Sequence, residues 1–393
     1  MKKKQRFMLK TLFFGALSLS ALIGLSPKAA AVYAEDGPVT VDLSTLTNHY
    51  VALDGDILTG TLTSDKHYKV SIAEGATVTL QDASITTIND SSYDWDGITL
   101  LGDANIILKG ANTIKSNRTY RSGIFVPENK TVTIDGDGSL NVTSSGNAIG
   151  ASSKKTGGNV TIKGGTIVAR AGQSHAAIGG GYNKAPVGNI TIEGGDITAY
   201  GGNYSPGIGC GETNYCGNIT ITGGTVRATG GDKAAGIGIG KHYQEYGGDI
   251  TITGGTVIAQ GGILAAGIGS GGEGNSKVGD ITITDTVDEV VAKKGGIQNG
   301  HQAINSIGAG YSGSNDLKAR FGTVTVLGTV YPEGVKDDTF AFPTFHKVTL
   351  NTDGGTIQEG DLTRYKEGAV TTLPTNVTKD FYTFKGWYNN ENF

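Results

Sequence analysis

The chain has 393 residues, and its 32 Lys and Arg residues are slightly outnumbered by 36 Asp and Glu residues. The acidic balance argues against nucleic acid or an anionic lipid surface as the main partner. Gly accounts for 64 residues, about twice the usual share, but it follows no collagen-like period. Because Gly recurs at fixed places in a repeat, it indicates backbone positions that need positive φ or close packing.

Residues 1–34 have the pattern of a secretory signal peptide. The basic start MKKKQRFMLK precedes a short apolar run and small residues that end in AAAVYA. The run is short for a bilayer span, so a membrane anchor is the weaker interpretation. We expect cleavage after Ala34, with Ala31 as the second choice. The rest of the chain then has 26 basic and 36 acidic side chains, a net charge of −10, and no later segment apolar enough to insert in a membrane.

Residues 35–70 are rich in β-forming residues and show no regular repeat. We expect this segment to form an N-terminal β cap. A solenoid needs such a cap because its open end would otherwise template the addition of further strands.

A Gly- and Thr-rich phrase then occurs five times at regular intervals. Its origin is the Asn or Asp that precedes ITI or VTI, and successive origins lie 30, 29, 31 and 31 residues apart: Asn159, Asn189, Asn218, Asp249 and Asp280. Aliphatic residues stand one and three positions later, with Thr between them. This alternation predicts a strand with one face buried in the core and the other exposed to solvent. A second strand follows a GG pair in the first four copies, and a third short strand follows a further turn.

Three short strands in about 30 residues, each with inward aliphatic side chains, predict one winding of a right-handed parallel β-helix. Weaker copies extend the pattern on both sides. We count about eight windings from near Thr77 to near Tyr331, in a β-helix domain of residues 71–331. Burying one Ile or Val side chain contributes roughly 1.5–3 kcal/mol, so columns of them hold the windings together. The predicted fold class is all-β.

The windings resemble Gly-rich repeats of exported proteins from Gram-positive bacteria. The resemblance is carried by phrases such as GNITITGGTVRATGG and AAGIGIG. Some of these proteins are labelled carbohydrate-binding, by likeness to a clostridial β-helix family that binds acidic pectic polysaccharide with calcium. The resemblance is specific for the fold and much less specific for the ligand.

The sequence changes character after the last winding. Residues 332–345 are expected to be a linker. Residues 346–393 contain VTLNTDGG and FKGWY, which resemble the internalin-type B repeat, also called the Listeria–Bacteroides repeat. That family is a small β-rich module of bacterial surface proteins. Its members usually continue with one further strand after GWY, so we expect a partial module or a longer protein.

The length variation of the windings falls at one corner, after the third strand. Insertions at one face of a solenoid often bind a ligand. Exposed Tyr rings there would stack on sugar rings, and strands that repeat near 4.8 Å suit a linear polysaccharide. The alternative is that the rings pack as lids over the corner. The candidate ligand-binding residues are Tyr182, Tyr215, Tyr243, Tyr246, Tyr311, His242, Lys184 and Lys241.

Two further pairs of residues are candidate sites. Asp249 and Asp280 end the Asn/Asp column; they either continue a ladder of hydrogen bonds between windings or attract a cation, and calcium would suit their oxygen ligands. Cys210 and Cys216 could form a small-loop disulfide in an exported protein, or remain free thiols. Two Cys residues with no nearby His set make a weak zinc site.

No outward-facing column of the windings collects carboxylates, so we expect no catalytic site. The best acidic pairs lie in SYDWDG and DGDG, and both read first as turns. The sequence favours a secreted or cell-surface, non-catalytic and monomeric protein that binds polysaccharide or host glycan along one edge of the β-helix. A rigid rod or stalk of a larger adhesin is the second hypothesis. A polysaccharide lyase or hydrolase is the third.

Overall fold

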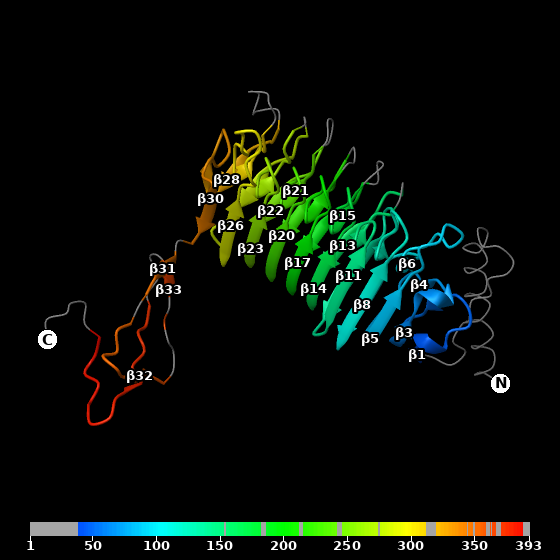
Figure 1. The fold of residues 1–393 in the computed structure, drawn as a ribbon, viewed down its shortest axis with the longest axis horizontal. Coiled ribbons are helices and arrows are strands. Elements are labelled where there is room, and N and C mark those ends of the chain that lie inside the picture. The colour runs from blue at the N-terminus through cyan, green and yellow to red at the C-terminus, as the bar shows by residue number, and fades with distance from the viewer. Residues whose placement is uncertain are drawn as a thin grey trace, which may run out of the picture.

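The computed structural model is a long stack of β-strand windings followed by a small β-rich module (Figure 1). It describes residues 38–152, 155–181, 186–211, 215–241, 246–273, 276–311, 320–343, 345–348, 350–358, 362, 364–366 and 371–387. The predicted signal peptide lies outside these residues. Within them, no helix has the length and apolar character that crossing a membrane requires.

The windings form three stacks of strands, which we name the first, second and short stacks. The first stack contains β5 (Thr77–Thr86), β7 (Ala104–Lys109), β10 (Thr131–Gly136), β13 (Asn159–Ile162), β16 (Ile190–Ile192), β19 (Ile219–Ile221), β22 (Ile250–Ile252), β25 (Ile281–Ile283) and β28 (Val324–Val326). The second contains β8 (Ala111–Ser116), β11 (Ser139–Ser144), β14 (Thr166–Arg170), β17 (Asp196–Tyr200), β20 (Thr225–Thr229), β23 (Thr256–Gln260) and β26 (Glu289–Lys293). The short stack contains β2 (Tyr50–Ala52), β4 (Val70–Ile72), β6 (Ile98–Leu100), β9 (Ile124–Phe125), β12 (Ile149–Gly150), β15 (Ile178–Gly180), β18 (Ile208–Cys210), β21 (Ile237–Ile239), β24 (Ile268–Gly269) and β27 (Ile307–Gly308).

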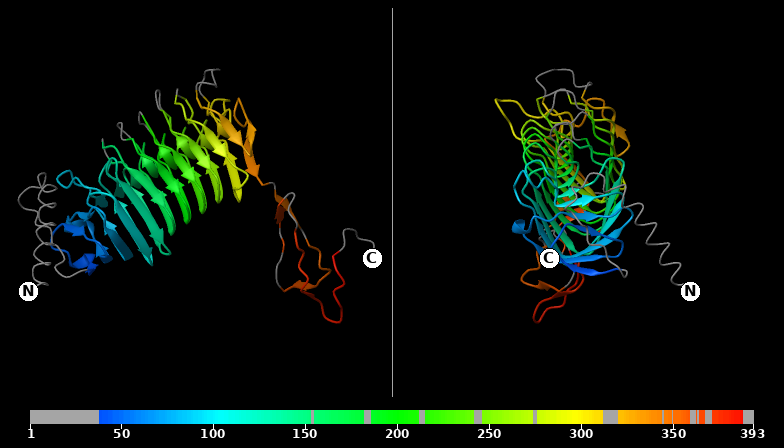
Figure 2. Two further views of the ribbon diagram at one scale, coloured as in Figure 1. Left: turned by 180° about the vertical axis from the view of Figure 1, so that it is seen from behind. Right: turned by 90° about the vertical axis from the view of Figure 1, so that its right-hand side faces the viewer.

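The predicted all-β solenoid is confirmed. Each strand pairs in parallel with its counterpart in the next winding, and the windings from β7–β9 to β25–β27 all contain one strand of each stack. In the winding before them, β5 is a single ten-residue strand that pairs with both β7 and β8. Seen from behind, successive windings lie side by side in one continuous stack (Figure 2).

The alternation in the repeat sorts side chains between the core and the surface, as predicted. One core column joins directly paired residues of β13, β16, β19, β22 and β25, all of them fully buried: Ile162, Ile192, Ile221, Ile252 and Ile283. The Thr residues between the aliphatic positions are partly exposed on the outer face. The columns therefore supply hydrophobic contacts between every pair of neighbouring windings.

Glycine is required in the short stack because the windings approach closely there. Gly179, Gly209, Gly238 and Gly269 have φ between 130° and 142°, a region that other residues rarely adopt. A Cβ at any of them would lie 1.7–2.1 Å from the carbonyl oxygen of the next winding. The recurring Ile-Gly pair thus combines a core side chain with the close approach of two backbones.

Residues 38–70, which we expected to form an N-terminal β cap, extend the parallel stack toward the N-terminus. β1 (Thr40–Asp42) pairs in parallel with β3 (Ile57–Leu62), which pairs with β5, while β2 pairs with β4. Two 3₁₀-helices, η1 (Leu43–Thr45) and η2 (Ser64–Lys66), interrupt these first windings. Leu43 in η1 is fully buried in the core cluster. The segment therefore continues the stack and also contributes to its N-terminal core.

The segment predicted as a linker closes the other end of the solenoid. β30 (Thr339–Phe342) pairs antiparallel with β26, and β29 (Thr329–Val330) pairs antiparallel with β28. Val335 is buried and forms a bridge with Ile307 of the short stack. An open parallel edge would expose unpaired backbone groups, and these strands cover it.

The C-terminal module has two antiparallel strand pairs. β31 (Phe345–Lys347) pairs with β33 (Arg364–Lys366), and β32 (Thr356–Ile357) pairs with β34 (Val377–Thr378). The Trp387 ring packs edge-on against Phe384, at 5.4 Å between centroids, and its Nε1–H donates to the Pro374 carbonyl at 2.6 Å. Residues of the FKGWY motif thus help to hold this module together.

Candidate functional site

Two of the predicted ligand-binding tyrosines are neighbours on one edge of the solenoid. Tyr215 and Tyr246 form a parallel bridge between successive windings, and Tyr246 forms another with Lys277. The Cys216 N–H donates to the Tyr246 carbonyl at 3.0 Å, which fixes this register. Each tyrosine is 61% exposed. Their backbones are therefore one strand spacing apart, about 4.8 Å, and their rings are accessible to a ligand.

A disulfide anchors the loop that carries Tyr215. Cys210 is the last residue of β18, and it is joined to Cys216, with 5.9 Å between their Cα atoms. Both Cys residues are buried in the core cluster. Tyr215 therefore lies directly before a covalently fixed residue, while its own side chain faces solvent.

The other candidate ligand-binding residues that the structure describes, Tyr311 and Lys241, are engaged in contacts elsewhere. The Tyr311 ring stacks on His301, with 4.4 Å between centroids. Lys241 donates to the Glu273 carboxylate at 2.8 Å, as does Lys233. The same Lys241 ammonium lies 5.3 Å from the centroid of the Tyr204 ring. Lys241 is therefore engaged in a contact between windings. Tyr182, Lys184, His242 and Tyr243 lie outside the described residues.

The Asn/Asp column is a ladder of hydrogen bonds between windings, which we name the Asx ladder: Asn159, Asn189, Asn218, Asp249 and Asp280. The side-chain Oδ1 of each residue accepts the backbone N–H of the next at 2.8–2.9 Å, and Asp280 accepts from the Thr323 N–H at 2.6 Å. An Asp oxygen can serve here as well as an Asn oxygen, because the donor is a backbone amide. The two acidic residues therefore have a structural role that needs no cation.

The glycines before Asn189, Asp249 and Asp280 make room for the ladder. A Cβ at Gly279 would lie 2.2 Å from the Oδ1 atom of Asp249. Among the residues that the structure describes, no three His, Cys, Asp or Glu side chains gather to hold a metal ion. Among the described residues, no third acidic side chain therefore joins Asp249 and Asp280.

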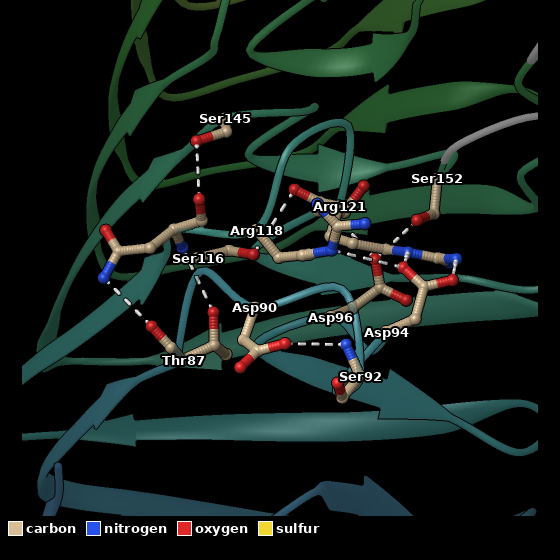
Figure 3. A network of polar contacts seen from close by, with 12 residues as sticks. Thr87, Asp90, Ser92, Asp94, Asp96, Ser116, Arg118, Arg121, Ser145 and Ser152 are labelled. Atoms are coloured by element: carbon tan, nitrogen blue, oxygen red, sulfur yellow. Dashed lines mark hydrogen bonds and ion pairs between the residues drawn. The ribbon is translucent and has the colours of Figure 1, made fainter. Parts of the chain in front are cut away.

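The acidic pair of the SYDWDG turn takes part in a polar network that joins three windings (Figure 3). Asp94 pairs with the Arg121 guanidinium, which lowers the pKa of the Asp94 carboxyl. The Asp96 Oδ1 atom accepts the Ser122 N–H at 2.7 Å and the Ser152 hydroxyl at 2.5 Å. Asp96 is buried, and burial raises the pKa of its carboxyl. Both carboxylates thus hold the loops around the short stack together.

Sequence reasoning missed a groove near the N-terminal end of the stack. It has a volume of about 590 Å³ and is lined by residues of the segments 46–49 and 65–68 together with Tyr93. These residues precede β2, β4 and β6 and come from three windings, with no repeat to connect them. The only signal in the sequence was the concentration of His, Tyr and Trp residues between His49 and Trp95.

Comparisons with known proteins agree with this architecture. Residues 160–182, 190–212, 219–238 and 250–272 match a family model described as a Beta helix repeat. Residues 346–393 match the model of the Listeria-Bacteroides repeat domain, which is the range predicted from the VTLNTDGG and FKGWY motifs. No curated protein and no solved structure matched the chain. The chain is thus similar to β-helix repeats over four of its windings and to the Listeria-Bacteroides repeat over its C-terminal segment.

Proposed function

We propose that this protein is an exported, non-catalytic surface protein whose solenoid binds polysaccharide along the edge that carries Tyr215 and Tyr246. We name this edge the tyrosine edge. The two kinds of repeat support a surface-type repeat protein. The main support for polysaccharide as the ligand is the direct backbone bridge between two exposed tyrosines in successive windings.

The faces of the two Tyr rings and the rigidity of the edge that carries them suit a sugar chain. Tyr offers a flat apolar face and a hydroxyl, which suits a pyranose ring with one apolar face and a polar rim. Two rings attached to a rigid edge lose little conformational entropy when a ligand binds, since the parallel ladder and the adjacent disulfide already fix their backbones. Lys277, the next residue of the column, would add a cation beside the second ring and favour an acidic sugar there.

The experiment is affinity electrophoresis of the purified protein in gels that contain one acidic or one neutral polysaccharide, with and without EDTA. We expect retardation by at least one polysaccharide. The double variant Tyr215→Ala/Tyr246→Ala should bind it about tenfold or more weakly, since each stacked ring contributes about 1 kcal/mol.

The matched control is Tyr200→Ala, which removes a tyrosine that is 39% exposed on β17 of the second stack. This variant should bind as the unmodified protein does. Full retention of binding by the double variant would refute the role of the tyrosine edge. A protein that no polysaccharide retards would instead favour a rigid rod, in which this edge has no ligand.

A further inference from the structure

Five aromatic rings form a continuous arc near the N-terminal end of the solenoid. Successive centroids lie 6.4 Å apart between Tyr68 and His49, 5.0 Å between His49 and Trp95, 5.3 Å between Trp95 and Tyr93, and 4.4 Å between Tyr93 and His67. The whole chain has two Trp and six His residues, and this arc contains one of the former and two of the latter. The arc thus gathers aromatic rings from three successive windings.

The stacking of windings explains why these rings meet. His49 precedes β2, His67 and Tyr68 precede β4, and the segment with Tyr93 and Trp95 precedes β6. These three strands are neighbours in the short stack, paired in parallel. The turns that enter them must therefore lie side by side, and rings that are distant in sequence come into contact.

The arc forms a wall of the groove that sequence reasoning missed. His49, His67, Tyr68 and Tyr93 line the groove, and all four are partly exposed. A second depression of about 310 Å³ shares residues 46–49 with it and extends toward β1. The volume of the groove by itself falls in the usual range for sites that hold small organic ligands.

Hydrogen-bond donors and acceptors also line the groove. Asn48 offers an amide, Thr47 a hydroxyl and Asp65 an exposed carboxylate, and all three line the groove. The ammonium of Lys66 donates to the Ser44 carbonyl at 2.5 Å, so that cation is engaged with the protein itself. A ligand with many hydroxyl groups can both donate to and accept from such a set, whereas a free anion would meet the carboxylate of Asp65.

The ring of His49 is held in one orientation. Its Nδ1 atom accepts the Lys69 N–H at 2.9 Å, so the proton of the neutral imidazole is on Nε2. Burial lowers the pKa of His49, and the charge of Lys69 adds to that effect. At neutral pH the residue is therefore an uncharged ring with one donor.

We propose that this groove, formed by residues 46–49, 65–68 and Tyr93, is a binding site for a neutral saccharide of one or two pyranose rings. The sugar ring stacks on Tyr93 and the adjacent imidazoles, and Asp65 and Asn48 bind its hydroxyl groups. This combination of ring faces with amide and carboxylate groups is the chemistry that recognises uncharged sugars.

The groove is independent of the tyrosine edge. It lies before the short strands, at β2 to β6, whereas Tyr215 follows β18 in the same stack. Four strand spacings separate β6 from β18, which is about 19 Å along the axis. One site could therefore bind a ligand while the other does not.

The position of Trp95 gives a direct optical readout. The chain has two Trp residues, and the other, Trp387, belongs to the C-terminal module. In the Trp387→Phe variant, tryptophan fluorescence therefore reports Trp95 alone. We would titrate this variant with glucose, galactose, mannose, N-acetylglucosamine and their β-linked disaccharides up to about 50 mM, which covers millimolar affinities.

We expect a saturable change in fluorescence with at least one of these sugars. In the Trp387→Phe background, Tyr93→Ala and Asp65→Asn should each weaken binding about tenfold, and Tyr200→Ala should leave it unchanged. Asp65→Asn is the safer test of the two, because Asp65 is exposed and the substitution is isosteric.

The proposal would be overturned if none of the sugars produced a saturable change in fluorescence. It would also be overturned if Tyr93→Ala and Asp65→Asn both bound sugar with unchanged affinity. The same titration of Tyr215→Ala/Tyr246→Ala separates the two sites. If the edge variant still binds sugar in the groove but loses polysaccharide, both proposals hold. If polysaccharide binding never depends on the edge while the groove still binds sugar, only the proposed function fails.

Discussion

The Oδ1 atom of Asp249 accepts the backbone N–H of Asp280 at 2.8 Å, so a carboxylate joins two successive windings. Asn218 accepts from the Asp249 N–H in the same way. The column thus uses an oxygen that Asn and Asp share, and the change from Asn to Asp along it does not alter the geometry. This relationship gives both acidic residues a place in the hydrogen-bond ladder.

The ladder predicts that Asp249→Asn leaves the free energy of unfolding almost unchanged, whereas Asp249→Ala lowers it by about 0.5–1.5 kcal/mol through loss of one hydrogen bond. Urea unfolding of the two variants measures the difference. EDTA should leave the melting temperature of the unmodified protein unchanged. Stabilisation by added calcium that disappears in Asp249→Asn would instead support a cation between Asp249 and Asp280.

The close approach in the short stack predicts a large effect of Gly238→Ala. Its φ is 130°, and a Cβ would lie 2.1 Å from the Gly269 carbonyl oxygen. Backbone strain of about 1–3 kcal/mol and a clash with rigid backbone should together lower the free energy of unfolding by more than 3 kcal/mol. Thermal unfolding followed by circular dichroism measures the loss.

Gly296→Ala is the matched control, because a Cβ there would meet only the side chain of Ile263, at an ordinary 3.6 Å. It should change the free energy of unfolding by no more than about 0.5 kcal/mol. Equal effects of the two substitutions would show that the short stack does not depend on the close approach of its windings.

The regular windings could be predicted because one rule, alternation at period two, decides which side chains enter the core. The first windings obey the same physics but are irregular in length: the paired residues Tyr50 and Val70 lie 20 positions apart, whereas Ile208 and Ile237 lie 29 apart. Without a fixed interval, the register of residues 38–70 could not be predicted, and we expected a cap there. Similarly, strand β30 was missed because it pairs antiparallel and follows no repeat.

The two candidate sites also differ in whether a repeat relates their residues. Tyr215 and Tyr246 each stand three positions before the Asx residue of their winding, so the register of the repeat places them side by side. Their role in binding stays a prediction. The groove could not be predicted, since His49, His67 and Tyr93 come from turns of different lengths that only the folded stack aligns. Asp96 reads as a turn residue in the sequence, and its burial depends on Ser122 and Ser152 from later windings.

Two neighbouring carboxyl groups should affect stability with opposite dependence on pH. Burial raises the pKa of Asp96 above its ordinary value near 3.8. Between that value and the raised pKa the folded state binds more protons than the unfolded state, so the stability contributed by Asp96 falls as the pH rises through this window. Asp96→Asn keeps the acceptor oxygen and cannot ionise. Its free energy of unfolding, relative to that of the unmodified protein, should therefore increase from pH 4 toward neutral pH.

Asp94→Asn is the control with the opposite sign. The bond to Arg121 lowers the pKa of Asp94, so its contribution is present above the ordinary value and is lost as the pH falls through the lowered one. Asp94→Asn should therefore lower the free energy of unfolding at neutral pH, and it should lower it less in acid. Because the side chain is half exposed, we expect a small effect. Parallel pH profiles for the two variants, measured by urea unfolding, would contradict the assignment.

The disulfide predicts a link between redox state and ligand binding at the tyrosine edge. Cys210 and Cys216 are six positions apart, and closing so short a loop should contribute about 2 kcal/mol. Replacing both Cys residues by Ala should lower the free energy of unfolding by about this amount.

The same replacement should also weaken polysaccharide binding, because Tyr215 precedes Cys216, while saccharide binding in the N-terminal groove stays the same. A reducing agent should reproduce these effects in the unmodified protein and have none on the variant. Unchanged polysaccharide affinity after reduction would show that Tyr215 does not need its anchored neighbour to bind.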